Sequence, residues 1–309
     1  MKKVMALLTA AAMAATLMAG CARSNAASSG SSGVSGSITA SGSSALAPLA
    51  QEAAQDYMAK NSKVSITVNA GGSGAGLNQV AQKSVDIGNS DLYAQEKLTA
   101  DQAKSLVDHQ VCVIGFAAVV NPDVTVTNLT TDQLVSIFTG KTTNWKDVGG
   151  ADEKITLIGR PSNSGTRATF EKYGLKGAAE ASSIALSSDD SGTLEKYVTQ
   201  TKGSIGYLAL SYLVGKNTVK KLSVNGVEAT QANIYSGKYD IWSYEHMYTN
   251  GTPNATVKAF IDYMTGSEFS KKMESLGYNV TAKMKVKHEA PAASSSSAAS
   301  SAASSTSSK

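Results

Sequence analysis

Serine, threonine and glycine residues gather at three points where the sequence pattern predicts that a strand is followed by a helix. These points are Gly42-Ser43-Ser44, Gly72-Ser73-Gly74 and Asn163-Ser164-Gly165-Thr166. Backbone N–H groups in the first turn of a helix have no partner inside the helix, and together they carry about half a positive charge. Glycine lets a ligand approach the backbone closely and a hydroxyl adds a donor, so each of these three corners can bind an anion.

Two charged residues extend this chemistry. Arg160 ends the strand that is predicted before the third corner, and its guanidinium can donate two parallel hydrogen bonds to an oxyanion. Asp91 follows a short predicted strand and would repel a fully deprotonated anion such as sulfate. Phosphate near neutral pH keeps a proton that a carboxylate can accept, so Asp91 favours phosphate over sulfate.

Each of these residues also has a structural interpretation that the sequence leaves open. A serine before a helix is commonly only an N-cap. Arg160 could form an ion pair at the surface or between domains, and Asp91 could cap a helix or pair with Arg160. These residues can form one binding site only if the three corners meet.

The elements that must position the corners form an alternating pattern between residues 37 and 288. Short β-rich runs alternate with amphipathic helical patterns, which predicts an α/β fold with a largely parallel sheet. Because parallel strands end at the same edge of a sheet, the corners are expected to converge there. The predicted strands cover residues 37–40, 64–68, 85–88 and 155–159, and the predicted helices begin near Leu46, Leu77, Thr130 and Arg167, with one more around 257–264.

Composition excludes several classes of function. The 309 residues include 28 basic and 24 acidic side chains, spread along the chain without the basic block typical of nucleic-acid-binding proteins. Two cysteines cannot form a disulfide scaffold, and three histidines far apart in sequence show no metal-ligand spacing. We therefore expect no metal, no cofactor and no nucleic-acid partner. Cys112 lies in an apolar run and is predicted to be a buried strand residue.

The two ends of the chain are set apart from this body. Residues 1–20 have the layout of a secretory signal, with an uncleaved anchor helix as the alternative. Met18-Ala19-Gly20-Cys21 is similar to a bacterial lipobox, which predicts lipidation of Cys21. Residues 21–36 are predicted to be a flexible tether, and residues 289–309, almost entirely serine and alanine, a disordered tail.

Five motifs occur in order along the body and together resemble the extracytoplasmic phosphate-binding proteins of Pst-type ABC importers. The resemblance covers about residues 36–280. It implies a two-lobed type II periplasmic-binding-protein fold, in which each lobe is a mostly parallel sheet flanked by helices and the ligand lies in the cleft between them. Residues 37–120 and 240–288 would form one lobe, and residues 121–239 the other. The motifs are Gly42-Ser43-Ser44-Ala45-Leu46, Gly71 to Gly76, Val85 to Asp91, Thr143-Asn144-Trp145-Lys146, and Arg160 with Ser164-Gly165-Thr166-Arg167.

The resemblance also implies a set of phosphate contacts and a transport role. Ser162 stands where some relatives have an aspartate that braces the arginine, and residues 189–193 are interpreted as a structural cap. The implied protein is a monomer, exported and lipid-anchored to the outer face of the cell membrane, that hands phosphate to permease subunits served by a cytoplasmic ATPase. The implied contacts are Ser44, the Ala45 amide, Ser73, Asp91, Arg160, Ser164, Gly165 and Thr166.

Two other functions remain as hypotheses. The same fold could bind another oxyanion, such as sulfate or molybdate, although Asp91 argues against this. A secreted phosphatase would need an activated nucleophile, a general acid or a metal. The sequence has no histidine near any corner, no metal-ligand cluster and no G-x-S-x-G elbow, so we expect no catalytic residues and no enzyme.

Overall fold

The computed structural model describes residues 34–291. The predicted signal, Cys21 and nearly all of the predicted tether and tail lie outside the described residues. Among residues 34–291, no helix has the length and apolar character needed to cross a bilayer.

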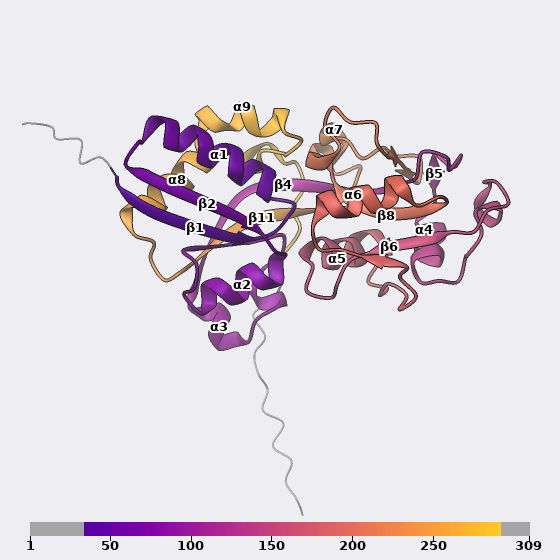
Figure 1. Ribbon diagram of the computed structural model, residues 1–309, viewed down its shortest axis with the longest axis horizontal. Coiled ribbons are helices and arrows are strands. Elements are labelled where there is room, and N and C mark those ends of the chain that lie inside the picture. The colour runs from indigo at the N-terminus through magenta and orange to yellow at the C-terminus, as the bar shows by residue number, and fades with distance from the viewer. Residues whose placement is uncertain (1–33, 292–309) are drawn as a thin grey trace, which may run out of the picture. The chain divides into compact units, whose positions relative to one another are not determined.

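One mixed sheet organises the described residues (Figure 1). Its strands follow the order β2–β1–β3–β11–β4–β8–β6–β7, and β9 adds to β4. A separate pair consists of β5 (Asn128–Leu129) and β10 (Ser223–Val224). The strands of the main sheet are β1 (Gly36–Gly42), β2 (Val64–Ala70), β3 (Ile87–Ser90), β4 (Leu106–Val120), β6 (Thr156–Gly159), β7 (Leu186–Ser187), β8 (Ser204–Ala209), β9 (Lys220–Lys221) and β11 (Trp242–Asn250).

The long strand β4 is shared by two halves of this sheet. Its residues 106–115 pair with β11, and its residues 116–120 pair with β8. We call β1, β2, β3, β11 and the start of β4 the first half, and the end of β4 with β6 to β9 the second half. The prediction of a largely parallel sheet holds for β1 with β2 and β3 and for β6 with β7 and β8. It fails at β4 and β11, which pair antiparallel with their neighbours.

Helices cover both halves. The first half carries α1 (Ala47–Lys60), α2 (Ser73–Ala81), α3 (Ala100–Lys104), α8 (Ala255–Thr265) and α9 (Ser267–Ser275), and the second half carries α4 (Thr131–Phe138), α5 (Gly165–Thr169), α6 (Ser191–Gln200) and α7 (Gln231–Ser236).

Local sequence signals account for several of these helices. In α4, the Thr130 hydroxyl accepts the N–H of Gln133 at 3.1 Å, and the Gln133 side chain accepts the N–H of Thr130 at 2.8 Å. This reciprocal capping box satisfies two donors that the helix leaves unpaired, as predicted. The predicted inner face of α8 is also confirmed. Its buried residues are Val257, Phe260, Ile261 and Met264.

Two helices begin earlier than predicted. α2 starts at Ser73 instead of near Leu77, and α5 starts at Gly165 instead of near Arg167. Two glycines of the run that suggested a loop, Gly74 and Gly76, lie inside the first turn of α2, where their lack of a side chain permits close packing. A Cβ on Gly76 would come within 2.6 Å of the Ser41 carbonyl oxygen. β3 also ends two residues later than predicted, at Ser90.

A single apolar core cluster draws residues from both halves, including Leu49 of α1, Phe116 of β4 and Tyr207 of β8. Cys112 lies in β4 with no exposed surface, which confirms the prediction of a buried strand residue.

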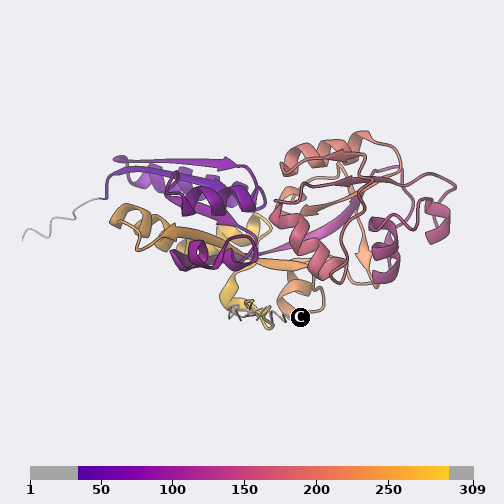
Figure 2. The same ribbon diagram turned by 90° about the horizontal axis from the view of Figure 1, so that it is seen from below.

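The last described residues lie where the two halves meet (Figure 2, in yellow). The Lys285 N–H donates to the Tyr235 carbonyl oxygen at 3.0 Å. The His288 ring stacks on Trp242, with ring centroids 3.6 Å apart, and on Tyr173, with centroids 3.9 Å apart. This segment therefore connects the second half with the beginning of β11.

Candidate functional site

The second and third corners meet at Asp91. The Ser73 hydroxyl donates to one carboxylate oxygen of Asp91 at 3.2 Å, and the Thr166 hydroxyl donates to the other at 2.8 Å. The Gly74 N–H donates to the Asn163 carbonyl oxygen at 3.1 Å, so the starts of α2 and α5 are in direct contact. The three segments predicted to form an anion site are thus adjacent.

The first corner joins them through the start of α6. The Ser44 hydroxyl donates to the Asp189 carbonyl oxygen at 2.8 Å and lies 2.9 Å from the Ser191 hydroxyl. Arg160 donates to the same two groups, each at 3.0 Å. Gly72 connects this group to the second corner, because a Cβ there would come within 1.7 Å of an Asp189 carboxylate oxygen.

All the predicted contact residues are buried, including Asp91 at 3% exposure and Arg160 at 1%. Among the described residues, no acceptor lies within hydrogen-bonding distance of the backbone N–H groups of Ala45, Gly165 and Thr166. Unpaired N–H groups at helix starts are donors for an anion. Ser164 acts as the N-cap of α5, where its hydroxyl accepts the Arg167 N–H at 3.4 Å.

Within the described residues, the structure excludes an ion pair for Arg160 and a pairing between Asp91 and Arg160. Among residues 34–291, no carboxylate lies within salt-bridge distance of Arg160, which donates to neutral oxygens instead. Asp91 does not pair with Arg160, and it accepts two hydroxyls. Ser162 is exposed and does not brace the arginine. The Ser191 hydroxyl and the Tyr207 ring, whose centroid lies 5.7 Å from the guanidinium carbon, hold Arg160.

Residues 189–193 do more than the predicted capping. Asp190 is the N-cap of α6, with its carboxylate accepting the Thr193 N–H at 2.7 Å, so the predicted cap is confirmed. Ser191 and the Asp189 carbonyl also contact Ser44 and Arg160, which sequence reasoning missed. The signal was present, because Ser191-Gly192-Thr193 repeats the residue types of the other corners.

Two buried acids behind the corners were also missed. Glu180 lies against Gly159, the residue before Arg160, since a Cβ on Gly159 would come within 2.7 Å of its carboxylate. Burial raises the pKa of Glu180 to about 7. Glu245 on β11 has no exposed surface, and burial, followed by the charge of Asp91, raises the pKa of Glu245 well above its ordinary value.

One histidine lies close to Asp91 in the fold, although none is near a corner in the sequence. β11 brings His246 opposite Ser90, next to Asp91 in the chain. One ring nitrogen of His246 lies 2.8 Å from the Asp108 carboxylate. Within residues 34–291, no three His, Cys, Asp or Glu side chains are grouped to hold a metal ion.

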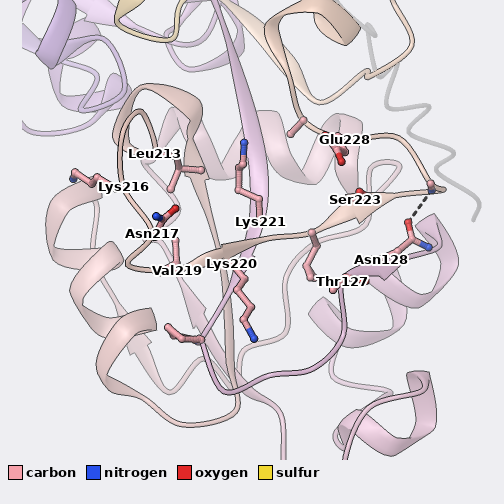
Figure 3. A pocket seen from close by; sticks show the side chains of 14 residues that line it. Thr127, Asn128, Leu213, Lys216, Asn217, Val219, Lys220, Lys221, Ser223 and Glu228 are labelled. Carbon is pink, nitrogen blue, oxygen red and sulfur yellow. Dashed lines mark hydrogen bonds between the residues drawn. The ribbon is translucent and has the colours of Figure 1, made fainter.

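A separate cavity of 710 Å³ lies in the second half (Figure 3). Three lysines line it, but Lys216 pairs with Glu195 at 2.8 Å and Lys220 donates to the Val124 carbonyl oxygen at 2.9 Å. The cavity shares no residue with the corners. We place the candidate site at the corners, because buried hydroxyls, free amides and a guanidinium converge only there in the described chain.

A mixed sheet in two halves, with helix starts gathered around a buried arginine, defines a substrate-binding protein of the type II periplasmic-binding-protein class. A family model described as a PBP superfamily domain matches residues 27–268. Among curated proteins, the chain is 49% identical over 257 residues to the phosphate-binding protein PstS of Bacillus subtilis, covering 83% of this chain and 84% of that protein. It is 29% identical over 254 residues to PstS of Borreliella burgdorferi, covering 78% and 88%.

Solved structures agree. A putative phosphate ABC transporter substrate-binding protein with bound phosphate from Clostridium perfringens is 28% identical, with a TM-score of 0.71, covering 79% of this chain and 99% of that one. An ABC-type phosphate transport receptor from Vibrio cholerae is also 28% identical, with a TM-score of 0.63, covering 78% and 99%. The chain belongs to the PstS family of phosphate-binding proteins. The names of these relatives confirm the predicted family, its fold and the expectation of a binding protein instead of an enzyme.

Proposed function

We propose that this protein captures inorganic phosphate outside the cytoplasm and delivers it to an ABC importer. The family supports this role, because the most similar relatives described above are named as phosphate-binding or phosphate-transport proteins. The observation that carries the proposal is the position of Asp91. A carboxylate at the centre of an anion-binding group of donors suits only an anion that still bears a proton.

The proposed contacts divide by their chemistry. Arg160 and the hydroxyls of Ser44 and Ser164 donate to phosphate oxygens, as do the backbone N–H groups of Ala45, Gly165 and Thr166. The hydroxyls of Ser73 and Thr166 keep their hydrogen bonds to Asp91 at the same place. Asp91 accepts the phosphate proton. Ser44 and Arg160 now donate to neutral oxygens of residues 189 and 191. A charged phosphate oxygen is a stronger acceptor, so ligand binding favours exchange of these partners.

The remaining parts of the chain are proposed to serve export and delivery. Residues 1–20 direct export, lipid on Cys21 holds the protein at the outer face of the membrane, and residues 21–36 act as a tether. Residues 37–120 with 240–288, and residues 121–239, act as two lobes, and residues 289–309 form a disordered tail. The monomeric protein meets permease subunits that a cytoplasmic ATPase serves.

Calorimetric titration tests the ligand. The purified protein is titrated with phosphate, sulfate and molybdate at neutral pH. We expect saturable binding of phosphate and none of the other two at matched concentration. Binding of sulfate or molybdate in preference to phosphate would replace the proposal with another oxyanion, and the absence of binding to all three would reject it.

Metabolic labelling tests the anchor. Cells that produce the protein are supplied with labelled palmitate, and the Cys21→Ser variant is compared with the wild type. We expect label in the wild type alone, with the variant released from the membrane. Equal labelling of both would contradict an anchor at Cys21.

A further inference from the structure

Glu245 is a buried carboxyl group next to the candidate site that the proposed phosphate contacts do not use. β11 runs antiparallel to β3, and the last pair of this ladder is His246 with Ser90. Glu245 and Asp91 are the next residues beyond that pair. Against β4, the register shifts between Glu245 and His246. Such a bulge redirects side chains and is common beside functional sites.

Four polar groups from other parts of the fold act on Glu245, and none of the four is a cation. They are the Asp91 carboxylate, the Ser43 hydroxyl, the Cys112 thiol of β4 and the Tyr278 hydroxyl. Glu245 has no exposed surface. Within residues 34–291, neither of its oxygens makes a hydrogen bond.

If Glu245 and Asp91 were both ionised in this buried place, the free-energy cost would be large. Removal from water disfavours the charged form, and a neighbouring negative charge disfavours it further. Both causes raise the pKa of Glu245 well above its ordinary value. A proton on Glu245 removes the repulsion and supplies the missing donor, because the contact with Asp91 becomes a charge-assisted hydrogen bond.

We propose that Glu245 is a positioning residue for phosphate selectivity, which keeps its proton and donates it to Asp91. An ionised carboxylate offers about four acceptor positions. Ser73 and Thr166 occupy two of them. Glu245 occupies a third and fixes Asp91 as an ionised acceptor, so that one position is left for the phosphate hydroxyl. This inference rests on the proposed function.

Two variants separate the donor role from simple packing. Glu245→Gln keeps the shape and offers an amide donor to Asp91, whereas Glu245→Leu keeps the bulk and removes the donor. In calorimetric titration with phosphate, we expect Glu245→Gln to match the wild type within about twofold, and Glu245→Leu to bind at least about tenfold more weakly. Glu245→Leu should also lose part of the preference for phosphate over sulfate. Glu268, whose side chain is largely exposed, provides control variants of the same two types that should leave affinity unchanged.

Infrared spectroscopy tests the proton itself and does not depend on the leucine variant folding. At pH 9, where Glu180 with its pKa of about 7 is ionised, we expect the wild type to show the carbonyl band of a protonated carboxylic acid, and Glu245→Gln to lack that band. Any one of three results would overturn the inference. These are absence of the band in the wild type, equal loss of phosphate affinity in both Glu245 variants, and full phosphate affinity in Glu245→Leu. Failure of the wild type to bind phosphate would instead reject the proposed function, since the band reports on Glu245 without ligand.

Discussion

At the scale of single residues, the proposed selectivity for phosphate rests on Asp91. Its carboxylate accepts hydroxyls from two different helix starts, so it is held in place before any ligand arrives. An amide in the same position offers a donor as well as an acceptor. It can therefore face the deprotonated oxygens of sulfate without repulsion.

We expect Asp91→Asn to weaken phosphate binding and strengthen sulfate binding, so that the ratio of the two dissociation constants falls by about tenfold or more. Competition titration measures this ratio. Asp101→Asn, an exposed change in the first turn of α3, is the matched control and should not alter it. An unchanged ratio in Asp91→Asn would remove Asp91 from the selectivity mechanism.

Glu180 is the residue whose charge state should govern stability near neutral pH. Its pKa of about 7 lies above the ordinary value of 4.5, so the folded protein holds this proton more tightly than the unfolded chain. The stabilising contribution is complete below pH 4.5 and is lost as pH rises to about 7, with a total of about 3 kcal/mol.

The Glu180→Gln variant removes this titration. We expect its free energy of unfolding, relative to the wild type, to rise by up to about 3 kcal/mol between pH 4.5 and pH 8. Urea denaturation at a series of pH values measures the difference. Glu268→Gln should track the wild type across the series, and parallel curves for Glu180→Gln and wild type would show that Glu180 does not titrate in this range.

At the scale of elements, the site depends on how closely the starts of α2 and α5 approach. Gly165 permits this contact, because a Cβ there would lie 2.1 Å from the Ser73 hydroxyl oxygen and 3.1 Å from the Asp91 Cβ. We expect Gly165→Ala to displace Ser73 from Asp91 and to weaken phosphate binding by about tenfold or more.

Gly71→Ala is the matched control for this change. It lies in the loop before α2, and nothing stands within 4 Å of its added Cβ. Titration with phosphate compares the two variants. Equal phosphate affinities in the two variants would mean that phosphate binding does not require close contact between the first turns of α2 and α5.

Sequence reasoning succeeded where the signal is local. The Thr130–Gln133 capping box and the inner face of α8 are both readable within one or two helical turns. The predicted convergence of the corners relied on the general arrangement of parallel strands, and it holds for the three corners. Ser191 was missed although the residue types around it repeat those of the corners. The positions of Glu180 and Glu245 could not be predicted, because an irregular segment and the antiparallel strand β11 bring them there from distant parts of the sequence.

At the scale of the whole body, the shared strand β4 and the larger of two apolar core clusters connect the two halves. Disruption of one half therefore exposes core residues of the other. We expect residues 34–291 to unfold in one cooperative transition, because the apolar cluster is continuous.

Phosphate should raise the midpoint temperature of that single transition. At a concentration about 100 times the dissociation constant, a ligand that binds only the folded state adds about 2.7 kcal/mol, which corresponds to a rise of roughly 5 °C or more in Tm for a protein of this size. Scanning calorimetry with phosphate, and with sulfate as the control, measures the shift. Two separate transitions, only one of them responsive to phosphate, would contradict this expectation.

The stacking of His288 between Trp242 and Tyr173 limits how far the chain can be trimmed for laboratory use. A shortened version that stops before His288 would leave two large rings facing water at the junction of the halves. Truncations and purification tags should therefore be placed beyond residue 291, where the serine- and alanine-rich stretch continues.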